Sequence, residues 1–183
     1  MEFITAAVLV NLGQPLKILN DIKLSRLRSG QVLVKIHFAG LCHSQLMEAR
    51  GHRGNDKYLP HLLGHEGVGT VIDLGPNVTK IKKGDEVILG WIKGNGSNEL
   101  GTTLHSNTLG EINSGPVTTF SNYSIVSENR VYKKPKNTPF KESVLYGCAL
   151  PTGAGIILNE LKPTENSNIV VIGLGGIGLS ALM

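Results

Sequence analysis

The chain has 183 residues, long enough for one domain with a hydrophobic core and short for two. Hydrophobic residues make up 40% of it and charged residues 17%, a globular balance that excludes disordered and fibrous classes. The net charge of +4 comes from scattered Lys and Arg without a basic stripe, so we expect no nucleic-acid partner. No apolar run reaches membrane-spanning length and no basic signal segment begins the chain, so we expect a cytoplasmic protein without a membrane partner.

Most of the chain predicts β-strands separated by turns. Strands are expected, in chain order, at residues 6–10, 16–19, 31–38, 67–74, 84–89 and 120–126. A short helix is expected at 44–50, with Ser44 as its N-terminal cap. Residues 91–116 are polar and glycine-rich without a sustained period, which predicts a long surface loop. Together the strands predict a small, irregular β-barrel that extends to about residue 134.

The C-terminal part has a different pattern, in which two helices flank one strand. A helix is expected from Thr152 to Leu161, and another begins at Leu179. Residues 168–172 between them form an apolar run of β-branched residues, typical of a strand buried on both faces. This expected strand leads directly into a glycine-rich segment at 173–178.

That segment contains the pattern GxGxxG, formed by Gly173, Gly175 and Gly178, with Gly176 inside the same turn. Between a buried strand and a helix, this pattern is typical of dinucleotide binding, because the glycines permit a tight turn and backbone approach to a pyrophosphate. The helix N-terminus then presents free N–H groups to the phosphates. A glycine-rich turn that serves packing alone is the alternative. The acidic residue that selects NAD over NADP is expected about 20 residues further on, past Met183, so either cofactor fits.

The two cysteines of the chain, Cys42 and Cys148, form a candidate zinc site together with His65. Two thiolates and one imidazole leave one position of a tetrahedral zinc open, which is typical of catalytic zinc. Separated Cys and His residues in a reducing compartment more often bind metal or act in catalysis than form disulfides. A disulfide, or two unrelated core cysteines, is the alternative. The zinc and nucleotide motifs together indicate an enzyme that acts on an alcohol or a carbonyl.

With their flanking residues, these motifs resemble the zinc-dependent alcohol dehydrogenase family, within the medium-chain dehydrogenase/reductase superfamily, over essentially the whole chain. The resemblance rests on the order and spacing of segments 40–44, 64–69, 84–87, 147–153 and 173–178. It implies a mainly β fold, with a GroES-like irregular β-barrel as the catalytic domain over residues 1–150. The truncated start of a Rossmann α/β coenzyme domain would follow over residues 151–183.

The resemblance implies a role for each site residue that matches a family motif. Cys42, His65 and Cys148 are expected to bind one catalytic zinc. Ser44 is similar to the hydroxyl that passes the alcohol proton outward. Glu66 resembles a carboxylate that tunes the zinc from beside a ligand, and a surface carboxylate is its alternative.

Two further residues have implied contacts with the coenzyme or the substrate. His43 resembles the residue that contacts the coenzyme pyrophosphate, and an exposed turn histidine is its alternative. Trp91 falls where the family places an aromatic wall of the substrate pocket, and a core tryptophan is its alternative. Among the other histidines, His37 is expected to be packed or at an edge in a strand. His52, His61 and His105 are expected to be exposed.

This sequence departs from the family pattern at three places. Residues 91–116 contain no cysteine, so no structural zinc is expected and one zinc per chain is the maximum. Gln45 stands where relatives usually have an aspartate that orients the zinc-bound imidazole, and it offers a hydrogen-bond acceptor without a charge. Met47 stands where some relatives extend the proton relay with a histidine.

We therefore expect a zinc-dependent oxidoreductase that transfers a hydride between an alcohol and an aldehyde or ketone, with NAD or NADP as the cofactor. Fewer than two helical turns follow Gly178, so we expect the chain to be the N-terminal portion of an enzyme whose complete form is a homo-oligomer. Two alternatives stay open: a catalytically inactive fragment of such an enzyme, and a zinc-free quinone or alkene reductase of the same superfamily.

Overall fold

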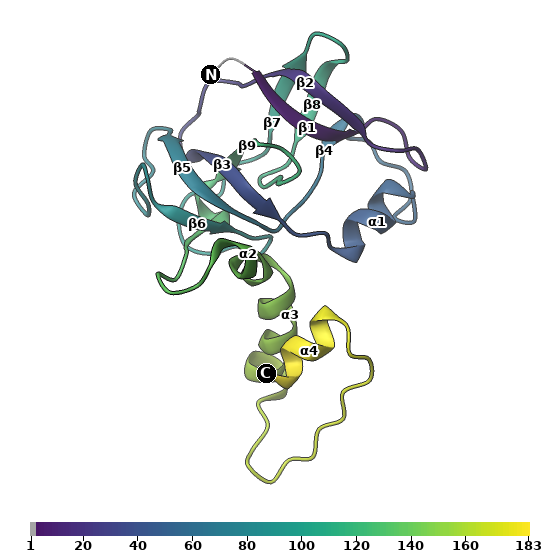
Figure 1. The fold of residues 1–183 in the computed structure, drawn as a ribbon, viewed down its shortest axis with the longest axis vertical. Helices are drawn as coiled ribbons and strands as arrows, with labels where there is room; N and C mark the ends of the chain where they lie inside the picture. Colours follow the sequence, from purple (N-terminus) through teal and green to yellow (C-terminus); the bar gives the residue numbers. More distant parts are fainter. Residues whose placement is uncertain (1–2) are drawn as a thin grey trace.

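Two β-sheets and a helical C-terminal segment make up the computed structural model, which describes residues 3–183 (Figure 1). The first sheet is a closed barrel with the order β1 (Phe3–Leu9), β2 (Lys17–Lys23), β7 (Thr102–Ser106), β8 (Gly110–Ser114) and β4 (His61–Leu62). The second sheet has the order β10 (Val131–Lys133), β6 (Glu86–Leu89), β5 (Gly67–Leu74), β3 (Gln31–Ala39) and β9 (Tyr123–Ser127). The mainly β fold and the six expected strands of the first 134 residues are thereby confirmed.

The strands alternate between buried and exposed side chains, which places one face of each sheet on a hydrophobic core. In β1 the residues Ile4, Ala6 and Val8 point inward, and their exposed fractions are 2% or less. Two large cores result, and a third, smaller cluster contains Val68, Ile88 and Val144. The barrel encloses a cluster that includes Ile22, Leu62, Leu104, Ile112 and Ile125, and the second sheet covers Val32, Val34, Val71, Val87 and Val126.

The prediction of a long loop over residues 91–116 is wrong for the second half of that range, because β7 and β8 form a hairpin there. Buried serines replace some of the apolar residues that usually mark inward positions: Ser106 is fully buried in β7. Its hydroxyl donates to Asp21 of β2 at 2.9 Å, and the backbone N–H of Thr108 donates to the same carboxylate at 2.8 Å. Polar contacts therefore stabilise the hairpin, and its amino-acid composition does not reveal them.

The helix expected at 44–50 is confirmed as α1 (His43–Ala49), but the prediction that Ser44 is its N-terminal cap is wrong. Cys42 occupies the N-cap position and no side chain caps the helix. Ser44 is the second helical residue, and its buried Oγ has no hydrogen-bond partner among residues 3–183. This frees the hydroxyl for the cavity described below.

A short helix, η1 (Glu128–Arg130), lies between β9 and β10. After β10, a series of short helices leads toward the C-terminus: α2 (Phe140–Ser143), η2 (Val144–Gly147), α3 (Ala149–Gly155) and the π-helix η3 (Ile156–Leu161). The helix expected over 152–161 is thus confirmed, with an earlier start. Within residues 3–183 no single helix meets the length and hydropathy of a membrane span; one pair, Phe140–Gly147 with Ala149–Leu161, meets them jointly but is bent by 51°.

The strand expected over residues 168–172 is absent, and the segment is an extended coil (Figure 1). Val170 and Ile172 are 83% and 95% exposed, because no strand among residues 3–183 pairs with this segment or covers it. A parallel-sheet strand needs neighbours on both sides. The helix after the glycine turn does form, as α4 (Gly176–Leu182), and it packs against α3.

Candidate metal centre

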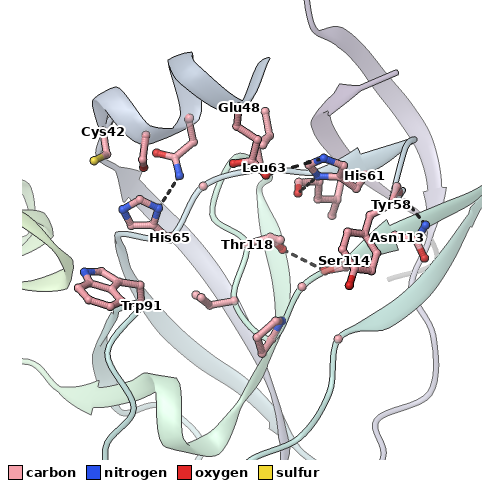
Figure 2. Close-up of a pocket in the computed structure, with 18 of the residues that line it drawn as sticks. Cys42, Glu48, Tyr58, His61, Leu63, His65, Trp91, Asn113, Ser114 and Thr118 are labelled. Atoms are coloured by element: carbon pink, nitrogen blue, oxygen red, sulfur yellow. Dashed lines mark hydrogen bonds and ion pairs between the residues drawn. The ribbon is translucent and has the colours of Figure 1, made fainter. Parts of the chain in front are cut away.

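Three separate segments bring Cys42, His65 and Cys148 together, and Figure 2 shows Cys42 and His65 at the cavity. Cys42 is the N-cap of α1, His65 lies between β4 and β5, and Cys148 lies between η2 and α3. Their ligand atoms all lie within 4.8 Å of one another, and His65 Nε2 is 3.2 Å from Cys148 Sγ. Two thiolates and an imidazole around a tetrahedral zinc lie roughly 3.5–3.8 Å apart. The donor set therefore fits one zinc ion, and both cysteines are free thiols rather than a disulfide.

Gly40, two residues before Cys42, and Gly147, directly before Cys148, allow this approach. A Cβ atom on Gly40 would lie 2.6 Å from Glu66 Cδ. A Cβ atom on Gly147 would lie 2.4 Å from the carbonyl oxygen of Leu89 and 2.9 Å from Glu66 Cβ. The two cysteine-bearing segments thus pack directly on Glu66, the residue that follows His65 in the chain.

Glu66 is 4% exposed, so the alternative of a surface carboxylate is wrong. Burial raises the pKa of its carboxyl group, and a hydrogen bond from the backbone N–H of Ala149 opposes this shift. Its Oε2 has no hydrogen-bond partner within the described residues. An unpaired buried polar atom costs about 1–3 kcal/mol, so a carboxylate held beside the ligands is better explained by a cation than by packing.

The charges around the thiols also favour a cation. Burial raises the pKa of Cys148 to about 12, and the neighbouring Cys42 and Glu66 contribute to the same shift. A divalent cation reverses this effect, because it stabilises the thiolate form. Burial also lowers the pKa of His65, with a smaller contribution from the positive charge of Arg53. At neutral pH the imidazole is thus in the uncharged form that binds metals.

Gln45 contacts the other nitrogen of the ligand imidazole. Its side-chain amide lies against Nδ1 of His65, and Gln45 is 7% exposed with no partner for Oε1 among the described residues. Metal on Nε2 leaves a proton on Nδ1. An amide rotated by 180° presents Oε1 to that proton, so Gln45 is able to orient the ring without adding a charge.

The three ligand residues line one end of a cavity of about 1010 Å³. Ser44, Gln45 and Trp91 share this end, and the buried Ser44 hydroxyl has no other partner within residues 3–183. Trp91 is 46% exposed, so the alternative of a core tryptophan is wrong and its ring forms part of the cavity wall (Figure 2).

The cavity also has a polar region that the sequence did not reveal. His61 was expected to be exposed but is 7% exposed, because β4 pairs with both β1 and β8. Its Nε2 lies 2.9 Å from Asp56 Oδ2 and 3.9 Å from Glu48 Oε1, a pair that Figure 2 shows. The only sequence signal for burial of His61 is the pair of leucines that follows it. The side chains of Glu48, Asp56 and His61 form a second group of the residue types that bind metals.

The remaining predicted residues lie outside this cavity. His43 is an exposed residue at the start of α1, and the glycines at 173–178 do not line the cavity. The glycine turn itself has the expected geometry. Gly173 has a φ of +97°, and a Cβ atom on Gly178 would lie 2.0 Å from the Gly173 carbonyl oxygen, whereas nothing lies within 4 Å of a Cβ atom on Gly175.

Of the other histidines, His52 and His105 are exposed as predicted, whereas His37 is exposed rather than packed. The ring of His37, in β3, contacts only the edge of the Phe140 ring, with a centroid distance of 4.9 Å, and its Nε2 lies 2.9 Å from Thr70 Oγ1. None of the three lines the cavity.

Comparison with known proteins identifies relatives along the whole chain. Residues 28–136 match the family described as "Alcohol dehydrogenase GroES-like domain". The chain is 33% identical over 202 residues to an alcohol dehydrogenase class-3 of Cereibacter sphaeroides, covering 97% of this chain and 53% of the relative. It is 32% identical over 203 residues to an S-(hydroxymethyl)glutathione dehydrogenase of Paracoccus denitrificans, with the same coverage. The chain therefore spans about half the length of these relatives.

Solved structures agree with this assignment. A benzyl alcohol dehydrogenase from Acinetobacter calcoaceticus superposes with a TM-score of 0.82 at 29% identity, covering all of this chain and 55% of that one. An alcohol dehydrogenase zinc-binding domain protein from Burkholderia ambifaria superposes with a TM-score of 0.86 at 28% identity, covering 98% of this chain and 55% of that one. The matched domain, the order of the motifs and the fold lead to one assignment: the chain belongs to the zinc-dependent alcohol dehydrogenase family of the medium-chain dehydrogenase/reductase superfamily and corresponds to its N-terminal portion.

Proposed function

We propose that this chain is the metal- and substrate-binding portion of an NAD- or NADP-linked alcohol dehydrogenase, with one catalytic zinc held by Cys42, His65 and Cys148. The observation that carries the proposal is the convergence of these three ligand atoms at one end of a large cavity. The bound zinc would act as a Lewis acid toward the substrate oxygen. The intact ligand set argues against the zinc-free quinone or alkene reductase.

The other residues at this end of the cavity support the same chemistry. Two thiolates offset the charge of the cation, and Gln45 orients the His65 ring through its second nitrogen. Ser44 presents a free hydroxyl to the cavity, where it accepts the proton of the substrate hydroxyl and passes it on. Trp91 bounds the space available to the substrate carbon skeleton.

For the coenzyme, we propose the turn that contains Gly173, Gly175 and Gly178, together with His43. The positive φ of Gly173 and the open space around Gly175 support this assignment, since a pyrophosphate needs close backbone approach. Residues 1–150 would then form the catalytic domain, and residues 151–183 would begin the coenzyme domain.

Metal analysis tests the ligand assignment directly. The purified protein, dialysed against zinc and then against buffer, is expected to retain one zinc per chain, and Cys148→Ser and His65→Gln are expected to retain less than about a tenth of it. His52→Gln, a change to an exposed histidine, serves as the matched control and should retain full zinc. Full zinc in Cys148→Ser would refute the ligand set. Alcohol-dependent reduction of NAD or NADP by the longer enzyme that contains this chain tests the reaction, and reduction of quinones without zinc would overturn it.

A further inference from the structure

A row of ionisable side chains connects the metal cavity with the protein surface. Glu48 lies on α1 one turn after Ser44, so both side chains lie on the same side of the helix, and both line the cavity. Glu48 also lines a second, smaller hollow of about 280 Å³, where Asp56 is found. Glu48 therefore borders both spaces, as do Arg53 and Tyr58.

His61 joins the two carboxylates and has one nitrogen free for proton transfer. Its Nδ1 lies 2.9 Å from the carbonyl oxygen of Leu62, which only accepts hydrogen bonds, so Nδ1 keeps its proton. Its Nε2 lies 2.9 Å from Asp56 Oδ2 and 3.9 Å from Glu48 Oε1. Nε2 is thus the nitrogen that faces both carboxylates, Glu48 of the cavity and Asp56 of the outer hollow.

The surroundings of this row are ionisable on one side and uncharged on the other. The segment that follows α1 contributes Arg53, Lys57 and Tyr58 to the outer hollow, next to Asp56. The strands paired with His61 contribute the uncharged partners Leu9 of β1 and Asn113 of β8. The charged and ionisable neighbours of the row therefore lie toward residues 53–58, of which Arg53 and Tyr58 also line the main cavity.

We propose that Glu48, His61 and Asp56 carry the substrate hydroxyl proton from the cavity to solvent. The inference rests on the proposed dehydrogenase function. In that reaction the C–H bond breaks with its electron pair, which reduces the nicotinamide as a hydride, and the substrate is oxidised to a carbonyl. The O–H proton must leave separately. Met47 has no group that carries a proton, so the proton passes from Ser44 through cavity water to Glu48, then to His61 Nε2, then to Asp56 and the bulk solvent.

Glu48→Gln in the complete zinc-loaded enzyme tests the route, because it keeps the size of the side chain and removes its proton affinity. We expect kcat for alcohol oxidation at neutral pH to fall about 100-fold, the lower end of the range for positioned acid–base groups, with KM unchanged. The loss should shrink as pH rises, because hydroxide replaces the missing acceptor. A small buffer base that does not bind zinc should restore much of the rate, and Glu48→Asp should retain most of it. Glu111→Gln, an exposed change on β8, is the control.

A second readout is independent of turnover. The visible spectrum of the cobalt-substituted protein should be the same for Glu48→Gln and the unmodified protein, and a changed spectrum would overturn the proposal, since Glu48 would then act on the metal. Unchanged kcat in Glu48→Gln, or a loss that no buffer restores, would also overturn it. If the unmodified enzyme oxidises no alcohol, the proposed function fails and the route fails with it; if both proteins are equally active, the route alone fails.

Discussion

Replacing Gly147 by alanine should weaken zinc binding without touching a ligand. The added Cβ atom would lie 2.4 Å from the Leu89 carbonyl oxygen and 2.9 Å from Glu66 Cβ. Ordinary contacts of a Cβ atom begin near 3.4 Å, so the segment must move by up to about 1 Å, and overpacking of this kind costs about 1–3 kcal/mol. Because Cys148 is the next residue, much of this cost should oppose zinc binding and lower the affinity about 10- to 100-fold.

The assay is a competition titration of zinc against a chelator of known affinity. Gly155→Ala is the matched control, because its Cβ atom would meet only the Asn159 side chain at 3.6 Å, an ordinary contact. The control should bind zinc as tightly as the unmodified protein. Equal zinc affinity in Gly147→Ala would refute the argument that Gly147 allows Cys148 to approach the site.

Three further predictions follow from the same structure. Gln45→Leu should lower zinc affinity about 10- to 100-fold in the same titration, because the His65 ring loses the partner at Nδ1, and Gln45→Glu should restore it. In chelator-treated protein at pH 8, Cys148 should react with iodoacetamide at least about 100-fold more slowly than an ordinary thiol, because its pKa of about 12 keeps it protonated, and the rate should rise with pH. Glu128→Ala should lower the free energy of unfolding by about 1–3 kcal/mol in urea, since the backbone N–H groups of Thr79, Lys80 and Ser97 lose their acceptor.

Glu128 also gives the last of these predictions a pH dependence. Burial raises the pKa of its carboxyl group, but hydrogen bonds from three backbone N–H groups outweigh burial and hold the pKa below its usual value of 4.5. A lowered pKa in the folded state means that the stabilisation is complete above pH 4.5 and is lost as pH falls through the folded value. The difference in urea midpoint between the unmodified protein and Glu128→Ala should therefore shrink on acidification below pH 4.5.

The sequence predicted that the three candidate ligands lie together better than it predicted the local structure around them. Cys42, His65 and Cys148 each lie in a short glycine-containing motif, and the packing of Gly40 and Gly147 on Glu66 explains why those glycines are there. The motifs are local, so they are visible in the sequence.

The features that the sequence missed depend on contacts between distant segments. The burial of His61 is set by its pairing with Leu9 and Asn113, and no local pattern encodes that pairing. The β7–β8 hairpin was missed because Ser106 is buried through hydrogen bonds rather than through hydrophobic contacts. The strand expected at 168–172 failed for the opposite reason: its composition is that of a central strand, but strand structure requires a partner.

The two-residue strand β4 has a mechanical consequence for the barrel. His61 and Leu62 close the gap between β1 and β8, and the proposed zinc ligand His65 follows only three residues later. A strand of only two residues contributes few hydrogen bonds of its own. An ion that binds His65 would therefore also restrain β4, the strand that closes the barrel. Metal removal should then open the pairing of β4 with β1 and β8 before the rest of the fold unfolds. The amides of Val8 and Leu9 should exchange hydrogen faster than those of β3.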